Sequence, residues 1–464
     1  MKTRDIVKRD PGFQYVVEEV ETMSSAGRRV LLDSPFITDA EVLEQEWQRL
    51  ERAVAVVSAQ PAAHDYTDLR HCFMQLHDLQ GTIGSLASRT VLNEVELFEL
   101  KNLASLNGKA RRALGQLGMD DVLPLPVLDD VFALLDPDGT GVVNFYIYDS
   151  YDLRLPPLRR ELRSLQEHGG DPVRISQLLA EQAEVQQQVC VRLSDRLATR
   201  AADLSAAMER LAYADSLFAR AEMARAWGLA RPSTGVRTAY TALFNPRLRR
   251  RNEELGLRYQ AVDIGLDAGV TLITGANMAG KTVLLKSVAV AQLMAQTGMF
   301  VPAAKGEVAL VDDLAYSIGD EQDEMNGLSS YASEIIKISD IVRRCRTERL
   351  LVLIDEPART TNPVEGRALV QSLVALLAGA DSTSLVTTHY GGLGQGCRRL
   401  RVRGFVEDLA GVPLTAQSIN SFIDYSLQED TSDDVPHEAL RIAEILGCDA
   451  ELLARARQSL RADE

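Results

Sequence analysis

The stretch TGANMAGKTVLL, residues 274–285, decides the fold of the second half of this chain. Gly275, Gly280, Lys281 and Thr282 complete the pattern G-x-x-x-x-G-K-[ST], between the apolar run TLIT and the helical run VLLKSVAVAQL. Glycines let backbone N–H groups converge on phosphate oxygens, the lysine adds a cation, and the hydroxyl can bind Mg²⁺ at a helix N-terminus. The stretch therefore predicts a loop that binds ATP and Mg²⁺. The residues expected to contact the nucleotide here are Gly275, Ala276, Asn277, Met278, Ala279, Gly280, Lys281, Thr282 and Val283.

Two later apolar runs end in residues that suit ATP hydrolysis. RLLVLIDE ends in Asp355 and Glu356, where the first acid can hold Mg²⁺ and the second can orient the attacking water. SLVTTHY places His389 at the end of another strand, where it could sense the γ-phosphate, although a lone histidine is more often a packing residue. The expected catalytic residues are Lys281, Glu356 and His389, and the expected metal ligands are Thr282 and Asp355.

The pattern of apolar residues changes near residue 235. Before it, apolar residues recur at helical spacing, and the run from Ile175 to Trp227 predicts one or two long amphipathic helices. After it, the β-rich runs GVTLITG, EVALVDDLAYSI, RLLVLIDE and TSLVTTH alternate with helical segments. Strands separated by helices imply a parallel sheet with covered faces. We therefore expect an all-α domain over residues 1–234 and an α/β domain with a parallel-sheet core over residues 235–430.

A short island interrupts the helical half. VFALLDPDGTGVVNFYIYDSYD predicts a small β-hairpin near residues 131–150, with its turn at DPDGTG. Asp136 and Asp138 also imitate the first half of an EF-hand calcium loop, but Ile147 stands where that loop needs a bidentate glutamate. The hairpin is therefore the preferred interpretation.

Bulk composition narrows the class of protein. The 464 residues carry a formal net charge of −16, which counts against a large nucleic-acid footprint without excluding a local basic patch. The five cysteines are scattered and include no CxxC pair, as expected of free thiols in a reducing compartment such as the cytoplasm. We expect neither a signal peptide nor a membrane span, because no suitable apolar run is present.

The second half of the chain resembles the ATPase domain of the MutS mismatch repair family. TGANMAGKTVLLKSVAVAQLMAQTGMFVPA is similar to the family's phosphate-loop segment, and LVLIDEPARTTNPVEG is similar to its acidic block. TTHY resembles the segment that carries the family's switch histidine, which supports a role for His389. The resemblance implies an ABC-type P-loop ATPase domain. Thr360, where a glycine is usual, and Ala358 depart from the family pattern and put the conformation of that loop in question.

The same resemblance implies a site shared between two chains. GLSSYASEI resembles the family signature, which reaches across a dimer to the partner's nucleotide, so Ser329, Ser330 and Glu334 are candidates for that role. Tyr259 stands where the family has an aromatic residue that contacts adenine. Residues 431–464 resemble the C-terminal helical element that helps MutS proteins dimerise. A homodimer and a MutS-like heterodimer both fit.

The helical half resembles the lever-helix domain of MutS. The family's DNA clamp would lie between the lever helices, but here the chain passes from helix to helix through one short loop, His168 to Pro172. The mismatch-reading and connector domains are likewise expected to be absent. The motifs GLSSYASEI, DEPARTTNP, TTHYGGL and SFIDYSLQED, followed by VPHEALRIAEILG, resemble a clamp-less MutS-related group. This resemblance implies a reactivating ATPase of adenosylcobalamin-dependent lysine or ornithine aminomutases.

Three functions remain open from these resemblances. The first is ATP-driven remodelling of a protein partner, such as a cobalamin-dependent aminomutase. The second is a DNA-acting relative in mismatch repair or recombination, supported by NPRLRRR, although arginines placed before a strand are more often paired within the chain. The third is a degenerate ATPase kept as a structural partner, which the intact Lys281 and Glu356 argue against. The basic run contains Arg247, Arg249, Arg250 and Arg251.

Overall fold

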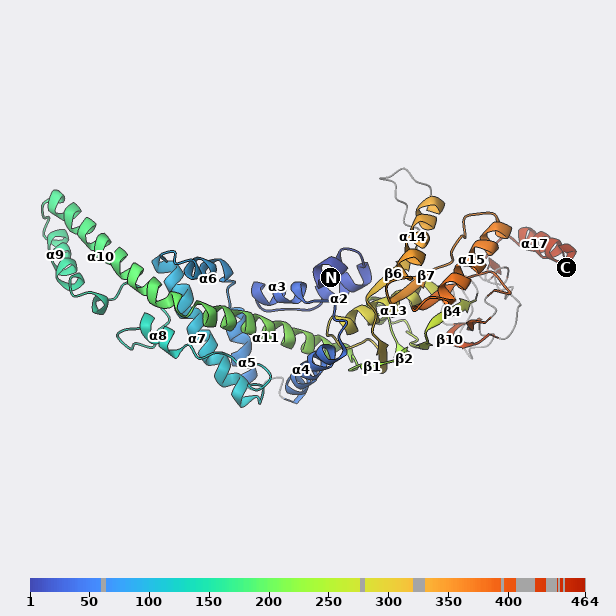
Figure 1. Ribbon diagram of the computed structural model, residues 1–464, viewed down its shortest axis with the longest axis horizontal. Coiled ribbons are helices and arrows are strands. Elements are labelled where there is room, and N and C mark those ends of the chain that lie inside the picture. Colours follow the sequence, from blue (N-terminus) through green and yellow to red (C-terminus); the bar gives the residue numbers. More distant parts are fainter. Residues whose placement is uncertain are drawn as a thin grey trace.

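A computed structural model describes residues 1–59, 64–275, 280–319, 330–393, 396–405, 422–430, 440, 443–444 and 447–463, with Ser330 and residues 460–463 described by their backbone alone. The molecule is elongated, with a helical arm (residues 64–227) at one end and a strand-containing part at the other (Figure 1). The predicted order, an all-helical region followed by an α/β region with a parallel sheet, is confirmed. Among the helices that the structure describes, none is long and apolar enough to cross a membrane.

Two long helices form the axis of the helical arm. The helix α10 begins after Asp171, whose side chain accepts a hydrogen bond from Val173 N, and Pro172 occupies its first turn. The helix α11 ends at Gly228, which has the left-handed backbone (φ 65°) that favours glycine. Each helix has 27 residues, so each is about 40 Å long. The helical elements are α1 Thr3–Val7, α2 Pro11–Glu18, α3 Ser25–Asp33, α4 Ala40–Ala59, α5 His64–Met74, α6 Gln80–Ala87, α7 Glu94–Gln116, α8 Asp129–Leu135, the 3-10 helix η1 Asp149–Tyr151, α9 Leu155–Glu167, α10 Pro172–Ala198 and α11 Ala201–Trp227.

The far end of the helical arm is a simple helical hairpin. The helices α9 and α10 are joined by residues 168–171, and they lie side by side at the tip (Figure 1). The predicted direct passage from helix to helix is therefore confirmed. The arm has no β-rich insertion between these two helices.

The predicted β-hairpin near residues 131–150 is wrong. The helix α8 covers its first part, and no strand is formed from there to η1. The turn does form, because the Asp136 carboxylate accepts hydrogen bonds from Thr140 Oγ1 and Gly141 N. The apolar residues after the turn pack against helices instead of pairing as strands, and Ile147 and Tyr148 are buried.

Two sheets make up the second part of the chain. One has four strands in the order β1-β5-β2-β3, and the other has six in the order β10-β9-β4-β8-β7-β6. In the larger sheet all neighbours are parallel except β10 and β9. The elements are β1 Ser233–Gly235, β2 Thr238–Leu243, α12 Pro246–Glu254, β3 Val262–Leu266, β4 Gly269–Thr274, α13 Lys281–Gln296, β5 Lys305–Ala309, β6 Asp313–Ser317, α14 Ser330–Arg344, β7 Leu350–Ile354, α15 Pro363–Ala378, β8 Thr383–Thr387, β9 Arg398–Phe405, β10 Ile423–Glu429 and α17 Ala450–Asp463.

Two runs were placed differently by the structure than by the sequence. EVALVDDLAYSI forms two strands in different sheets, β5 and β6, and the chain turns at residues 310–312 between them. NPRLRRR does not lead directly into a strand, since its arginines lie on the helix α12, which Asn245 caps by accepting a hydrogen bond from Leu248 N.

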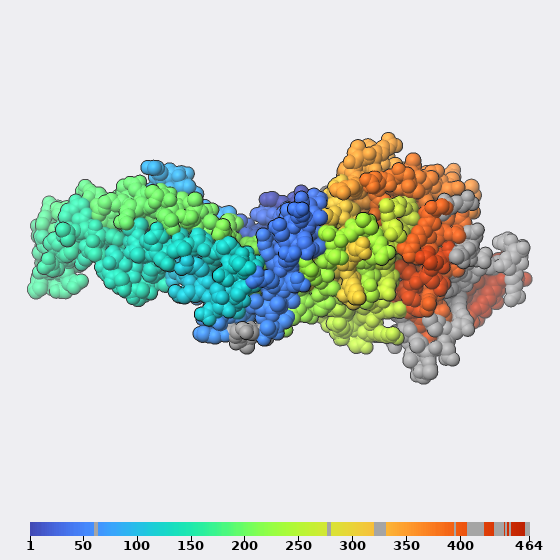
Figure 2. Space-filling model, turned by 60° about the horizontal axis from the view of Figure 1, so that its bottom comes forward, coloured from blue at the N-terminus to red at the C-terminus, as the bar shows by residue number. Residues whose placement is uncertain are grey.

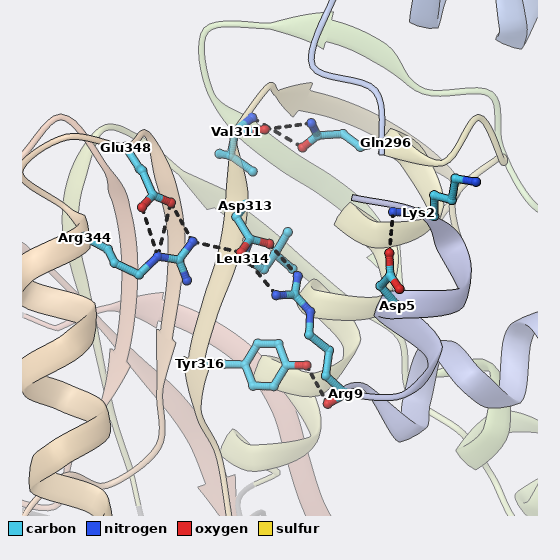
Figure 3. A network of polar contacts seen from close by, with 10 residues as sticks. All are labelled: Lys2, Asp5, Arg9, Gln296, Val311, Asp313, Leu314, Tyr316, Arg344 and Glu348. Carbon is cyan, nitrogen blue, oxygen red and sulfur yellow. Dashed lines mark hydrogen bonds and ion pairs between the residues drawn. The ribbon is translucent and has the colours of Figure 1, made fainter. Parts of the chain in front are cut away.

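The N-terminal segment (residues 1–20) lies between the helical arm and the sheets (Figure 2). Arg9 contacts the Asp313 carboxylate at the start of β6, and Arg344 of α14 contacts the same carboxylate at 2.8 Å (Figure 3). Tyr15 stacks on Trp227, the last residue of α11, with ring centroids 6.1 Å apart. The segment therefore contacts the end of the arm directly, and it is linked through the shared Asp313 carboxylate to α14, the helix that begins in the signature run.

Candidate active site

The larger sheet brings the site residues to one edge. The strand β4 lies between β9 and β8, and β8 lies between β4 and β7. Because these strands are parallel, their carboxyl ends meet at the same edge of the sheet, which is where ligands bind in open α/β folds. Three segments therefore converge there: the phosphate loop after β4, the acidic pair after β7 and the histidine after β8.

The phosphate loop leads directly into the helix α13. Gly275 (φ 144°) and Gly280 (φ 74°) both have backbones that favour glycine, and a Cβ on Gly280 would lie 2.9 Å from the Tyr425 ring. Gly280 is the N-cap of α13, so the first N–H groups of this helix point into the loop. Val283 lies on the first turn and is exposed. The predicted contact residues Ala276, Asn277, Met278 and Ala279 lie outside the described residues.

Lys281 connects the loop to the acidic pair. Its ammonium donates a hydrogen bond to Gly275 O at 2.6 Å and forms an ion pair with Glu356 Oε1 at 3.1 Å. The two side chains are 4% and 13% exposed, so this pair is largely withdrawn from water. Arg359 adds a second cation 3.9 Å from Glu356. The predicted catalytic pair Lys281 and Glu356 is thus brought together.

The two predicted metal ligands also meet. Thr282 Oγ1 lies 2.5 Å from Asp355 Oδ2, although the two residues come from α13 and from the end of β7. Hydroxyl and carboxylate oxygens are the hard donors that Mg²⁺ prefers, and Mg²⁺ usually uses one or two protein ligands beside phosphate oxygens. This donor set, next to the phosphate loop, fits Mg²⁺ bound together with a nucleotide.

His389 follows β8 and faces the same group of charges. Burial lowers the pKa of its imidazole, Glu356 opposes this, and the cations Lys281 and Arg359 lower it further. The net pKa lies below its usual value of 6.5, so the ring is mainly neutral at pH 7. A neutral imidazole can donate a hydrogen bond to a phosphate oxygen through one nitrogen.

The structure describes only part of the signature run. Ser329 lies outside the described residues, and Ser330 is described as the first residue of α14 without its side chain. Glu334 accepts a hydrogen bond from Ala358 N of its own chain at 3.0 Å. The helix that starts in the signature run is therefore tied to the loop that follows Glu356.

The tyrosine that packs against the nucleotide loop is Tyr425, whereas the sequence indicates Tyr259. The hydroxyl of Tyr259 accepts a hydrogen bond from Asn245 N at 2.7 Å, and the next residue, Gln260, bonds to Asp424 of β10. Tyr425, adjacent to Asp424, packs against Gly280. Its place next to the loop depends on the pairing of β10 with β9, for which the local sequence gave no signal.

A phosphate loop, a buried lysine, a hydroxyl–carboxylate pair and an acid at one edge of a parallel sheet define a P-loop ATPase domain. A family model described as MutS domain V matches residues 271–462. This part of the chain is thus similar to MutS domain V, an ABC-type ATPase domain, and such a domain binds ATP with Mg²⁺.

Curated relatives extend the same similarity. The chain is 37% identical over 199 residues to "Endonuclease MutS2" of Geobacillus thermodenitrificans, covering 43% of this chain and 25% of the relative. It is 34% identical over 219 residues to "Endonuclease MutS2" of Thermus thermophilus, covering 47% and 28%. It is 32% identical over 232 residues to "DNA mismatch repair protein MutS" of Thermus aquaticus, covering 50% and 28%. The chain thus spans about a quarter of the length of these relatives.

Proposed function

We propose that this chain is a dimeric, ATP-driven conformational motor that acts in the cytoplasm by remodelling or reactivating a protein partner, with cobalamin-dependent aminomutases as the candidate class. One combination of features carries the proposal. The residues proposed for hydrolysis lie together, yet the arm closes through residues 168–171 and has no clamp insertion between α9 and α10.

In the proposed reaction each charged residue of the site has one task. Lys281 binds the β- and γ-phosphates, exchanging its contacts with Gly275 O and Glu356 for phosphate oxygens. Thr282 and Asp355 hold Mg²⁺, which neutralises charge on the phosphates when bound. Glu356, released from Lys281, orients the attacking water, and neutral His389 donates to the γ-phosphate. Tyr259 contacts adenine, and Ser329 and Ser330 of a second chain complete the site.

A continuous set of contacts supports output through the arm. The helix α14 is tied to the Glu356 loop by Glu334 and to Asp313 by Arg344. Asp313 also accepts a hydrogen bond from Arg9. Burial raises the pKa of Asp313, but the two arginines lower it more, so its net pKa lies below the usual value and the carboxylate stays charged. The N-terminal segment in turn stacks on the end of α11. Movement of α14 at the dimer interface would therefore reach the arm through this segment.

The alternative function is a DNA-acting relative, as the names of the curated relatives suggest. Its best support, the basic run on α12, is largely used within the chain. Arg250 pairs with Glu19, and Arg249 donates to Trp227 O at 2.7 Å and stacks on Phe244 at 3.8 Å. The Arg247 guanidinium lies over the Tyr15 ring at 5.9 Å. These contacts weaken the case for a DNA-binding surface on α12.

The test is reactivation in a defined mixture. A purified adenosylcobalamin-dependent aminomutase carrying damaged cofactor is mixed with this chain, fresh cofactor and Mg-ATP, and recovery of its activity is followed. We expect recovery with the wild-type chain and about a hundredfold slower recovery with Glu356→Gln, which should bind ATP without hydrolysing it. Glu365→Gln, a matched change at an exposed glutamate of α15, should behave as wild type.

The same preparation separates the two functions. Glu356→Gln loaded with Mg-ATP is also tested for binding to labelled duplex DNA at physiological salt. Tight DNA binding together with no recovery of the aminomutase would overturn the protein-partner proposal. Turnover of ATP by Glu356→Gln near the wild-type rate would instead overturn the role given to Glu356.

A further inference from the structure

Thr387, the last residue of β8, contacts both acids of the site. Its side chain is completely buried. The hydroxyl Oγ1 lies 2.6 Å from Asp355 Oδ1 and 2.9 Å from Glu356 N. An amide N–H can only donate, so the hydroxyl accepts from Glu356 and must give its own proton to Asp355. One threonine hydroxyl therefore joins the carboxylate of one acid to the backbone of the next.

The contact to Asp355 completes the support of that carboxylate. Its second oxygen, Oδ2, accepts a hydrogen bond from Thr282 Oγ1. A hydroxyl that donates its proton to Asp355 keeps its lone pairs available, which suits a group that binds Mg²⁺. The carboxylate is thus fixed at both oxygens, by a hydroxyl from α13 and by one from β8.

The contact to Glu356 holds an unfavourable backbone. Glu356 has φ 44°, in the left-handed region that costs a residue with a Cβ about 1–2 kcal/mol. Such a conformation persists when neighbouring contacts determine it. The β7–β8 pairing ends at Ile354 and Val386, so Glu356 N lies beyond the ladder, and the Thr387 hydroxyl supplies its acceptor.

Thr387 itself sits on rigid backbone. It is paired with Ile273 of β4, the strand that leads into the phosphate loop, and the next residue donates from its N–H to Ile273 O at 3.0 Å. The hydroxyl therefore fixes the positions of Asp355 and Glu356 relative to β4, the strand that leads into the phosphate loop.

We propose that Thr387 is a positioning residue for ATP hydrolysis, which sets Asp355 and Glu356 in one fixed geometry relative to the phosphate loop. The proposal rests on the roles proposed above for those two acids. The simpler explanation is that a buried strand threonine only satisfies its own hydroxyl. Ser384 on the same strand shows that a buried hydroxyl here need not form a hydrogen bond, because its completely buried hydroxyl has no partner among the described residues.

The test compares Thr387→Val with Thr387→Ser and with Thr383→Val, the same substitution at the buried start of β8. Losing a hydrogen bond to a charged group should lower kcat for ATP about tenfold to a hundredfold in Thr387→Val. KM for ATP should change less than about threefold, because Lys281 and the loop are untouched. The Mg²⁺ concentration for half-maximal rate should rise. Thr387→Ser should recover most of kcat, and Thr383→Val should retain it.

A double variant shows whether Thr387 acts through Glu356. In the Glu356→Gln background, Thr387→Val should cause little further loss, because two changes that disable one function are not additive. If Thr387→Val does not fold, Thr387→Cys takes its place, since a thiol has similar size but donates weakly.

Three results would overturn the inference: wild-type kcat in Thr387→Val or Thr387→Cys, an equal loss in Thr383→Val, or no recovery in Thr387→Ser. In each of these cases a stalled Glu356→Gln leaves the proposed function intact. An active Glu356→Gln would instead overturn the role given to Glu356, on which this inference rests.

Discussion

Two buried lysine–carboxylate pairs, Lys101–Asp136 in the helical arm and Lys281–Glu356 in the ATPase domain, have the same N–O distance of 3.1 Å. Their surroundings differ. Lys101 donates to Asp136, to Asn144 O at 2.9 Å and to Tyr148 Oη at 3.2 Å, which uses all three of its protons. Its side chain is 0% exposed. This pair is a closed structural contact.

The second pair lies among further charges. Glu356 is 13% exposed and has Arg359 at 3.9 Å, and His389 feels the charges of both Lys281 and Glu356. Lys281 is attached to a loop that is built for phosphates. The comparison shows that the distance and burial of an ion pair do not distinguish a structural role from a functional one. The groups around it decide whether its partners can be exchanged for a ligand.

The largest effect is expected where the closed pair is broken. Lys101→Met should lower the free energy of unfolding by about 3–5 kcal/mol, because Asp136 is left as an uncompensated buried charge. Burial raises the pKa of Asp136, but Gly141 N–H, Thr140 and Lys101 together bring it below its usual 3.8. The stability that the charged Asp136 contributes is present above pH 3.8 and is lost as pH falls through the lower pKa of the folded state. The difference in the free energy of unfolding between wild type and Lys101→Met, measured by denaturant unfolding, should therefore become smaller in acid.

Asp136→Asn provides the control for that prediction. The amide oxygen can still accept from Gly141 N, and the amide NH₂ can donate to the Thr140 hydroxyl. In the double variant with Lys101→Met no charge is therefore left buried. Part of the stability should return. ATP hydrolysis by Lys101→Met at a temperature where it is folded should equal wild type, and a tenfold loss there would contradict the comparison.

The second effect concerns the exchangeable pair. Lys281→Met should lower kcat/KM for ATP about a hundredfold to a thousandfold, because the cation facing the phosphates is lost. Its free energy of unfolding should change less than that of Lys101→Met, since Glu356 is partly exposed and keeps Arg359 nearby. A larger stability loss than in Lys101→Met, with hydrolysis retained, would make Lys281 a structural residue as well.

The two pairs also show what the sequence could and could not indicate. Lys281 was predictable because the phosphate loop is a local pattern, and its meeting with Glu356 followed from parallel strands whose carboxyl ends share one edge of the sheet. Lys101 gave no signal, because its partner lies beyond another helix and a turn. The same contact explains the failed hairpin, since Tyr148 is held by Lys101 inside the arm. Thr387 was missed because its role depends on where the β7–β8 ladder ends.

The smallest expected effect is the influence of the Lys281 charge on the pKa of His389. The cations Lys281 and Arg359 disfavour the imidazolium of His389, in addition to burial, while Glu356 favours it. Lys281→Met should therefore raise the pKa of His389 towards 6.5, and Lys101→Met should leave it unchanged. An NMR titration of the histidine side chains measures both. Because this effect acts through space without ATP, it reports the position of Lys281 even where hydrolysis is abolished. An unchanged pKa in Lys281→Met would mean that the ammonium is held away from His389, and the exchangeable pair would then lie outside the hydrolysis site.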